Sequence, residues 1–209
     1  MKSMFLSVSA LSLLVLAGPS YAAPTDQPGH KSPAPGANSD TASAMKDTTA
    51  GVVGKVSAEM THSTTGFVTA AAMSDMYEVE AGKIAAKRAS SAAVKDFAEH
   101  MVKAHSETAD KLKSILASNN ISVAPPAHLD NRRQGMIDDL RGAKSEDFDH
   151  RYLTQQQAAH EEAQILMRGY AKDGDNASVK EFASDTLPAV QDHLAMVKKI
   201  EAEMKTASK

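Results

Sequence analysis

The sequence predicts an all-α fold, a four-helix bundle with a short extra helix in its middle connection. Over four long segments the apolar residues recur at spacings of three and four, which is typical of helices that bury one face. Alternating runs of β-branched residues and hairpin turn pairs, which would indicate strands, do not occur. Ala, Met and Leu carry the apolar content, and straight-chain residues lose little rotamer freedom in a helix.

Residues 1–22 are expected to be a signal peptide. Lys2 supplies a positive charge, the apolar run MFLSVSALSLLVLAG follows, and Ser20 and Ala22 are small residues at the cleavage positions. An uncleaved anchor is the alternative, although the run is shorter than the roughly 20 residues that span a membrane. We therefore expect a periplasmic or secreted chain without a transmembrane segment in its mature part. The chain has no cysteine, which excludes disulfides and thiol chemistry.

Residues 23–65 are expected to form a disordered linker rich in Pro, Ala, Ser and Thr. They contain too few large apolar side chains to offset the entropy lost on ordering. The helical bundle domain is expected over residues 66–205, with 206–209 as a tail. The net charge of −3 gives no electrostatic support for binding nucleic acid, so no such partner is expected.

The first two long helices are separated by a pair of serines. The first is expected to begin at Thr64 or Thr65, since either side chain could cap it. It ends before Ser90 and Ser91, and the second helix then runs to about residues 118–120. Because this connection is short, the two helices are expected to lie antiparallel and side by side.

The middle connection is longer. Pro125 and Pro126 exclude a continuous helix there, and a short helix is expected over about residues 130–141. The third long helix begins after Ser145, which could cap it, and extends to about Lys172.

The last long helix is expected over Ala177 to about Met204, and it contains a proline. Pro188 removes one backbone hydrogen bond and should kink the helix about one turn before His193. The alternative is a break in the helix, with Thr186 capping a new helix that begins at Leu187.

Each long helix places one ionisable residue near the middle of its apolar stripe. These residues are Glu80, His105, His160 and His193. In an antiparallel bundle they could converge on one layer of the core, where unpaired polar groups would cost several kcal/mol. Three imidazoles and a carboxylate suit a divalent transition metal such as zinc, iron or copper. We therefore predict a metal site, with Glu78 facing elsewhere and Glu161 and Glu162 able to orient His160.

The alternative is a purely structural layer, in which the same four side chains satisfy one another by hydrogen bonds. The Glu-x-x-His pattern of di-iron carboxylate bundles is absent, because Val102 follows Glu99 and Ile165 follows Glu162 at the third place. Oxidase and iron-storage chemistry are therefore disfavoured. Catalytic nucleophile motifs and phosphate loops are also absent, so an enzyme is expected only if the metal supplies the chemistry.

Methionines at helical spacing suggest a second kind of metal site. Thioethers bind soft copper, but at this spacing methionine is more often core filler. The residues concerned are Met73, Met76, Met101, Met136, Met167 and Met196.

Three segments together resemble a bacterial envelope domain of unknown function often labelled "predicted outer membrane protein". They are FVTAAAMSDMYEVEAGKIAAKRASSAAVKDFAEHMVKAHSETADKL, FDHRYLTQQQAAHEEAQIL and FASDTLPAVQDHLAMVKKI. The resemblance implies a ferritin-like four-helix bundle and matches the family motifs at Glu80, His105, His160 and His193. Ala104 stands where the family often has an acidic residue.

Two functions are therefore expected as alternatives. The first is an exported periplasmic bundle that binds a transition metal through the Glu/His cluster and is linked to envelope stress. The second is a non-enzymatic interaction module that binds an envelope protein partner, with a core layer that is structural only.

Overall fold

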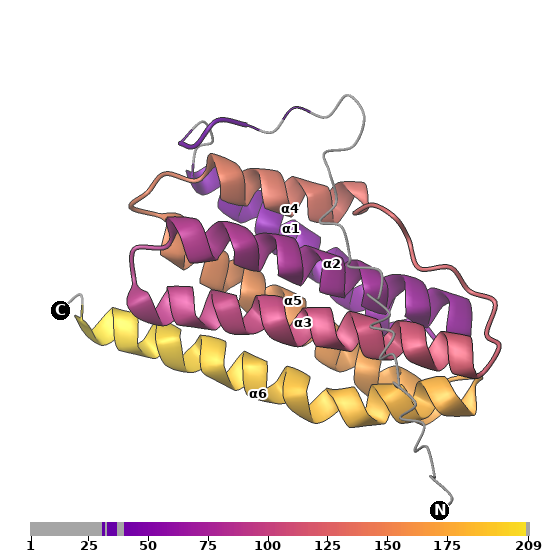
Figure 1. Cartoon of the computed structure of the whole chain (residues 1–209). Coiled ribbons are helices and arrows are strands. Elements are labelled where there is room, and N and C mark those ends of the chain that lie inside the picture. Colours follow the sequence, from indigo (N-terminus) through magenta and orange to yellow (C-terminus); the bar gives the residue numbers. More distant parts are fainter. Residues whose placement is uncertain (1–30, 32, 37–39, 208–209) are drawn as a thin grey trace, which may run out of the picture.

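A computed structural model describes residues 31, 33–36 and 40–207, which form six α-helices and no strand (Figure 1). The all-α prediction is confirmed. None of these helices combines the length and the hydropathy that a membrane crossing requires. The helices are α1 (Asp40–Glu59), α2 (Thr64–Arg88), α3 (Ala92–Ser118), α4 (Asn131–Gly142), α5 (Phe148–Asp173) and α6 (Ala177–Ala207).

Four of the helices enclose the interior of the molecule. Helix α2 packs against α3 and α5, and α6 packs against the same two helices from the other side (Figure 1). Helices α1 and α4 contact each other and α5, and α4 also contacts α2. The long helices are thus covered on one side by α1 and α4, which leaves α2 and α5 buried on more than one face.

The helix boundaries follow local capping chemistry. Ser63 caps α2 by accepting a hydrogen bond from the Gly66 amide over 3.2 Å, one residue before the expected Thr64 or Thr65. The α2–α3 turn is held by Asp149 of α5. Its carboxylate accepts bonds from the Ser90 and Ser91 amides at 2.9 and 2.8 Å. Helix α6 runs through Pro188 without interruption, which contradicts the alternative of a break there.

Two apolar clusters fill the interior and leave a polar zone between them. The first cluster includes Phe97 and Tyr152, and the second includes Phe67 and Tyr170, whose rings stack with centroids 4.2 Å apart. Along α3, Met101 of the first cluster precedes His105, and Leu112 of the second cluster follows it. Polar residues on the neighbouring helices lie at the same level. We call the set Asp75, Glu78, His105, Gln156, His160 and His193 the polar layer.

The expectation of disorder over residues 23–65 is wrong for residues 40–59, which form α1. The buried residues of α1 are polar or small, which is why a pattern of large apolar residues did not reveal the helix. Ser43 donates to Asp139 at 3.2 Å, and Asp47 accepts from Gln155 Nε2 at 2.9 Å. Among residues 40–60, the large apolar residues that are exposed are Met45, Val52, Val53, Val56 and Met60. The expected signal peptide, 1–22, and residues 208–209 lie outside the described residues.

Candidate metal centre

Three of the four predicted ligands meet in the interior. His105 on α3, His160 on α5 and His193 on α6 are buried, and their ring centroids lie 5.4 to 5.6 Å apart. One potential ligand nitrogen from each ring lies within 4.8 Å of the others. A tetrahedral zinc site with Zn–N bonds of about 2.0–2.1 Å places its nitrogens about 3.3 Å apart. Small side-chain rotations would therefore bring these three nitrogens into bonding positions.

The backbone of α5 sets the tautomer of His160. Its Nδ1 lies 2.9 Å from the carbonyl oxygen of Gln156, one turn earlier in the same helix. A carbonyl can only accept, so Nδ1 donates and the lone pair of the neutral ring is on Nε2. Burial, followed by the charge of His105, lowers the pKa of His160 well below its ordinary value. Nε2 is buried and has no hydrogen-bond partner in the described part of the chain.

Asp75 of α2 orients His105 in a comparable way. The Nδ1 of His105 donates to Oδ1 of Asp75 over 2.8 Å, which leaves Nε2 directed elsewhere and unpartnered among residues 40–207. Burial lowers the pKa of His105, but the hydrogen bond to Asp75 and the charges of Glu78 and Asp75 outweigh burial and raise it. Burial also raises the pKa of Asp75. A carboxylate bonded to the outer nitrogen of an imidazole is the usual support of a histidine metal ligand.

His193 of α6 is the third histidine of the site. Burial, together with His105 and His100, lowers the pKa of His193 to about 3, so its ring is neutral at physiological pH. Its Nδ1 is buried and finds no hydrogen-bond partner in the described residues. The ring packs edge-on against the exposed His100, with centroids 5.2 Å apart. Each of the three imidazoles thus has a buried nitrogen without a partner.

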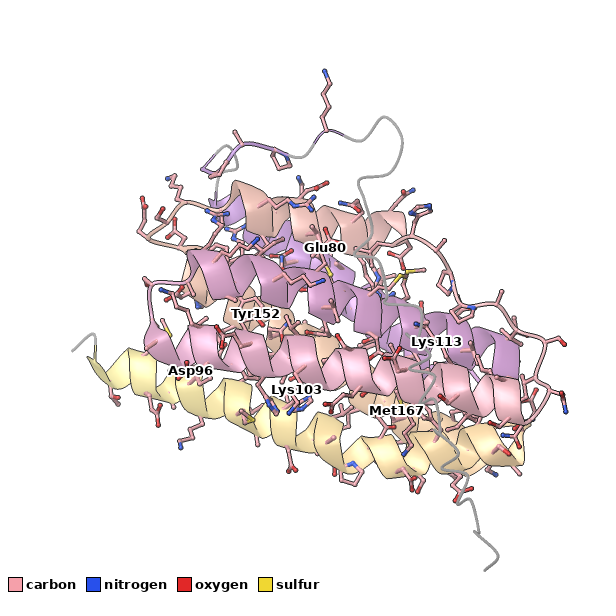
Figure 2. All side chains as sticks on the ribbon, in the orientation of Figure 1. Glu80, Asp96, Lys103, Lys113, Tyr152 and Met167 are labelled. Atoms are coloured by element: carbon pink, nitrogen blue, oxygen red, sulfur yellow. The ribbon has the colours of Figure 1, made fainter. Side chains whose placement is uncertain are left out.

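The prediction that Glu80 joins the histidines is contradicted by the geometry. Glu80 pairs with Arg141 of α4, with Oε1 and Nη2 2.6 Å apart, and Figure 2 shows it on the part of α2 that lies beside α4. Glu78, expected to face elsewhere, lies in the polar layer. Because six consecutive residues of α2 from Met73 to Glu78 are buried, the apolar pattern could not tell which face meets the histidines.

A different signal could have identified the inward face of α2. Asp75 and Glu78 share a face with Ala71 and Gly82, at spacings of four, three and four. A side chain at Gly82 would approach the carbonyl oxygen of Ala98 to 2.9 Å, so α2 and α3 lie very close there. Small residues at this spacing indicate the close contact with α3, and the stripe predicted for this helix did not include them.

Glu78 and Gln156 complete the polar layer. The amide of Gln156 donates to Oε2 of Glu78 over 2.6 Å, while Oε1 of Glu78 lies 3.8 Å from Nδ1 of His160. Burial raises the pKa of Glu78 to about 7, although the charge of His105 and the bond from Gln156 act the other way. Oε1 is buried, with no hydrogen-bond partner in the part of the chain described. Glu78 therefore places a carboxyl group beside two of the imidazoles.

The two glutamates that follow His160 do not orient it. Glu161 pairs with Lys55 of α1. Glu162 accepts from Arg132 at 2.8 Å and from Arg133 at 2.7 Å, and so joins α5 to α4. The expectation that they support His160 is wrong, because they lie on the side of α5 that faces α1 and α4.

A small cavity adjoins the histidines. Its volume is about 20 Å³, close to the space of a single water or bare ion. Asp75, His105 and His193 line it together with Met167 and Ala163 of α5. The residues present fit a bound transition metal, because imidazoles from three helices converge beside a small cavity.

Comparison with known proteins gives one match. A family model described as "Domain of unknown function (DUF4142)" matches residues 33–200. No curated protein and no solved structure matches the chain.

Proposed function

Since the chain belongs to the family described as a domain of unknown function (DUF4142), we propose its function from the site itself: it is an exported helical-bundle protein that binds a transition metal ion through His105, His160 and His193. One observation carries the proposal. Three imidazoles on three helices lie together, and each has a buried nitrogen without a hydrogen-bond partner among the described residues. Buried polar atoms are ordinarily paired, and leaving one unpaired costs about 1–3 kcal/mol.

The same observation disfavours a layer that is structural only. In such a layer the imidazoles would donate to one another or to the carboxylates, and their nitrogens would be satisfied. Here Asp75 and the Gln156 carbonyl each bind the outer nitrogen of a ring and leave the inner nitrogen unpartnered. A metal ion would satisfy all three inner nitrogens at once.

The residues of the polar layer have separate tasks in this proposal. A bound metal supplies a positive charge and open coordination sites for nitrogen donors. Asp75 holds His105 in orientation, and the Gln156 carbonyl does the same for His160. Glu78 adds negative charge that offsets part of the charge of the ion. The small cavity leaves little room for a substrate, which suits sequestration better than turnover.

The ferritin-like architecture and the cellular location are parts of the same proposal. Contacts of α2 with α3 and α5, and of α6 with the same two helices, support a ferritin-like four-helix bundle. The basic, apolar and small-residue pattern of residues 1–22 supports export to the periplasm. Metal sequestration outside the cytoplasm is the role through which we link the protein to envelope stress.

Metal titration of protein prepared without an affinity tag tests the proposal. We expect zinc(II) to bind at one ion per chain and to raise the melting temperature. His160→Leu should abolish both effects, whereas His150→Leu should retain them, because His150 is an exposed residue of the same helix. Absence of stoichiometric binding by zinc(II), cobalt(II) and copper in the unaltered chain would overturn the metal proposal. An interaction module with a structural core layer would then be the better account.

A further inference from the structure

We propose, on the premise of the metal site above, that its preferred ion is monovalent copper and that the thioether sulfur of Met167 is the fourth donor. The inference rests on the place of Met167 in the cavity and on the softness of the donor set. Neither follows from the three histidines alone.

Met167 lies on the wall of the same cavity as two of the histidines. Its side chain is buried, and it lines the 20 Å³ cavity with His105, His193 and Ala163. It lies two turns after His160 on one face of α5, about 10.5 Å along the helix axis. The side chain of methionine is unbranched and has three rotatable bonds, which lets its sulfur turn toward the cavity. Ala163 lies between the two and is small enough to leave space for an ion.

The other methionines of the predicted stripes have different surroundings. Met73 accepts a hydrogen bond through Sδ from the Asp130 amide at 3.2 Å, and Met196 is 37% exposed. Met76, Met101 and Met136 belong to the first apolar cluster, away from this cavity. Among the described residues, Met167 is therefore the one methionine that lines the cavity beside the histidines.

The donor set of the cavity disfavours hard ions. Magnesium and calcium require six or more oxygen ligands, which imidazoles and a thioether do not supply. A set of imidazoles with one thioether is a soft to borderline donor set, and thioethers favour copper(I) over harder divalent ions. The proposed donor set contains no thiolate, since the chain has no cysteine.

Competition with a copper(I)-specific chromophoric chelator, without oxygen, tests the inference on the full chain. We expect Met167→Leu to weaken copper(I) binding at least tenfold and to leave zinc(II) binding within about twofold. Met101→Leu should change neither, because Met101 is equally buried but lies in the other apolar cluster. Leucine has a similar volume, and such swaps usually cost less than about 1.5 kcal/mol, so the variants should fold.

X-ray absorption of the unaltered chain loaded with copper(I) gives a second readout that does not depend on a variant. We expect one sulfur scatterer in addition to imidazole nitrogens. Unchanged copper(I) affinity in Met167→Leu, or a spectrum with nitrogen neighbours only, would overturn the inference while zinc(II) binding still supported the metal site. Failure of every metal to bind would overturn the site and this inference together.

Discussion

Asp75 fixes the ring of His105 through a single bond of 2.8 Å from Nδ1 to Oδ1. Asp75→Asn keeps an oxygen acceptor in place but removes the negative charge that makes the imidazole a better ligand. We expect the affinity for zinc(II) to fall about 10–100-fold, as is usual when such a carboxylate partner is lost. Calorimetric titration measures the change, with Asp185→Asn as an exposed control. Equal affinities in the two variants would contradict the role given to Asp75.

Asp47 makes stability depend on pH. Burial raises the pKa of Asp47 to about 6 in the folded chain, from an ordinary value of 3.8. The folded state therefore favours the protonated carboxyl. The stabilisation that the protonated Asp47 adds to the free energy of unfolding is fully present below about pH 4. It is lost as the pH rises through about 6.

Asp47→Asn removes the ionisable group but keeps the side-chain oxygen that accepts a hydrogen bond from Gln155. At pH 8 we expect the free energy of unfolding of this variant to exceed that of the unaltered chain by at most about 3 kcal/mol. At pH 4 the difference should almost vanish. Urea denaturation at the two pH values measures this. A difference that does not change with pH would show that Asp47 ionises normally.

Helix α1 depends on a close approach to α5 at Gly54. A Cβ atom added there would lie 1.8 Å from Oε2 of Glu162 and 2.7 Å from Nη1 of Arg132. Gly54→Ala should therefore displace α1 or break the Glu162–Arg132 pair, and destabilise the chain by about 1–3 kcal/mol. Gly135→Ala is the matched control, since nothing lies within 4 Å of its added Cβ. It should stabilise α4 by about 0.5–1 kcal/mol.

Hydrogen exchange resolves this effect by helix. In Gly54→Ala the amides of α1 should lose protection first, while those of α3 and α6, which do not touch Gly54, should keep theirs. If α1 exchanges equally in the unaltered chain and in both glycine variants, α1 is not held by this contact.

Helices α2 to α6 could be predicted from the sequence, because each has an apolar stripe, a cap or a breaker near its end. Helix α1 could not be predicted, because Ser43, Asp47 and Gly54 face the interior and Met45 and Val52 face outward. Helices α4 and α5 satisfy the polar side chains of α1 through hydrogen bonds and an ion pair. Such long-range partners are visible only after the chain has folded.

The candidate site, like the fold, could be predicted only in part from the sequence. One histidine near the middle of each stripe predicted that His105, His160 and His193 would meet, and the prediction of their proximity is confirmed. The choice of Glu80 over Glu78 was wrong, and Asp75 was not anticipated, because α2 is buried on several faces. The covering helix α4, with Arg141, determines where Glu80 goes, and no local pattern in α2 encodes that.

Across the whole molecule, the polar layer interrupts a core that would otherwise be continuous and apolar. His160→Leu removes a buried imidazole whose Nε2 has no partner in the described residues. Without metal we expect this variant to melt at the same temperature as the unaltered chain or higher, because the desolvation of the ring is no longer a cost. With excess zinc(II) the order should reverse, because ligand binding stabilises only the unaltered chain. A His160→Leu chain that unfolds without metal would indicate that the layer is structural.

The most direct test of the central claim is an anomalous difference map from a crystal grown with zinc(II) and measured at the zinc edge. The account predicts one strong peak about 2.0–2.3 Å from a nitrogen of each of His105, His160 and His193. An interior without a peak, or zinc only at exposed residues such as His150, would contradict it.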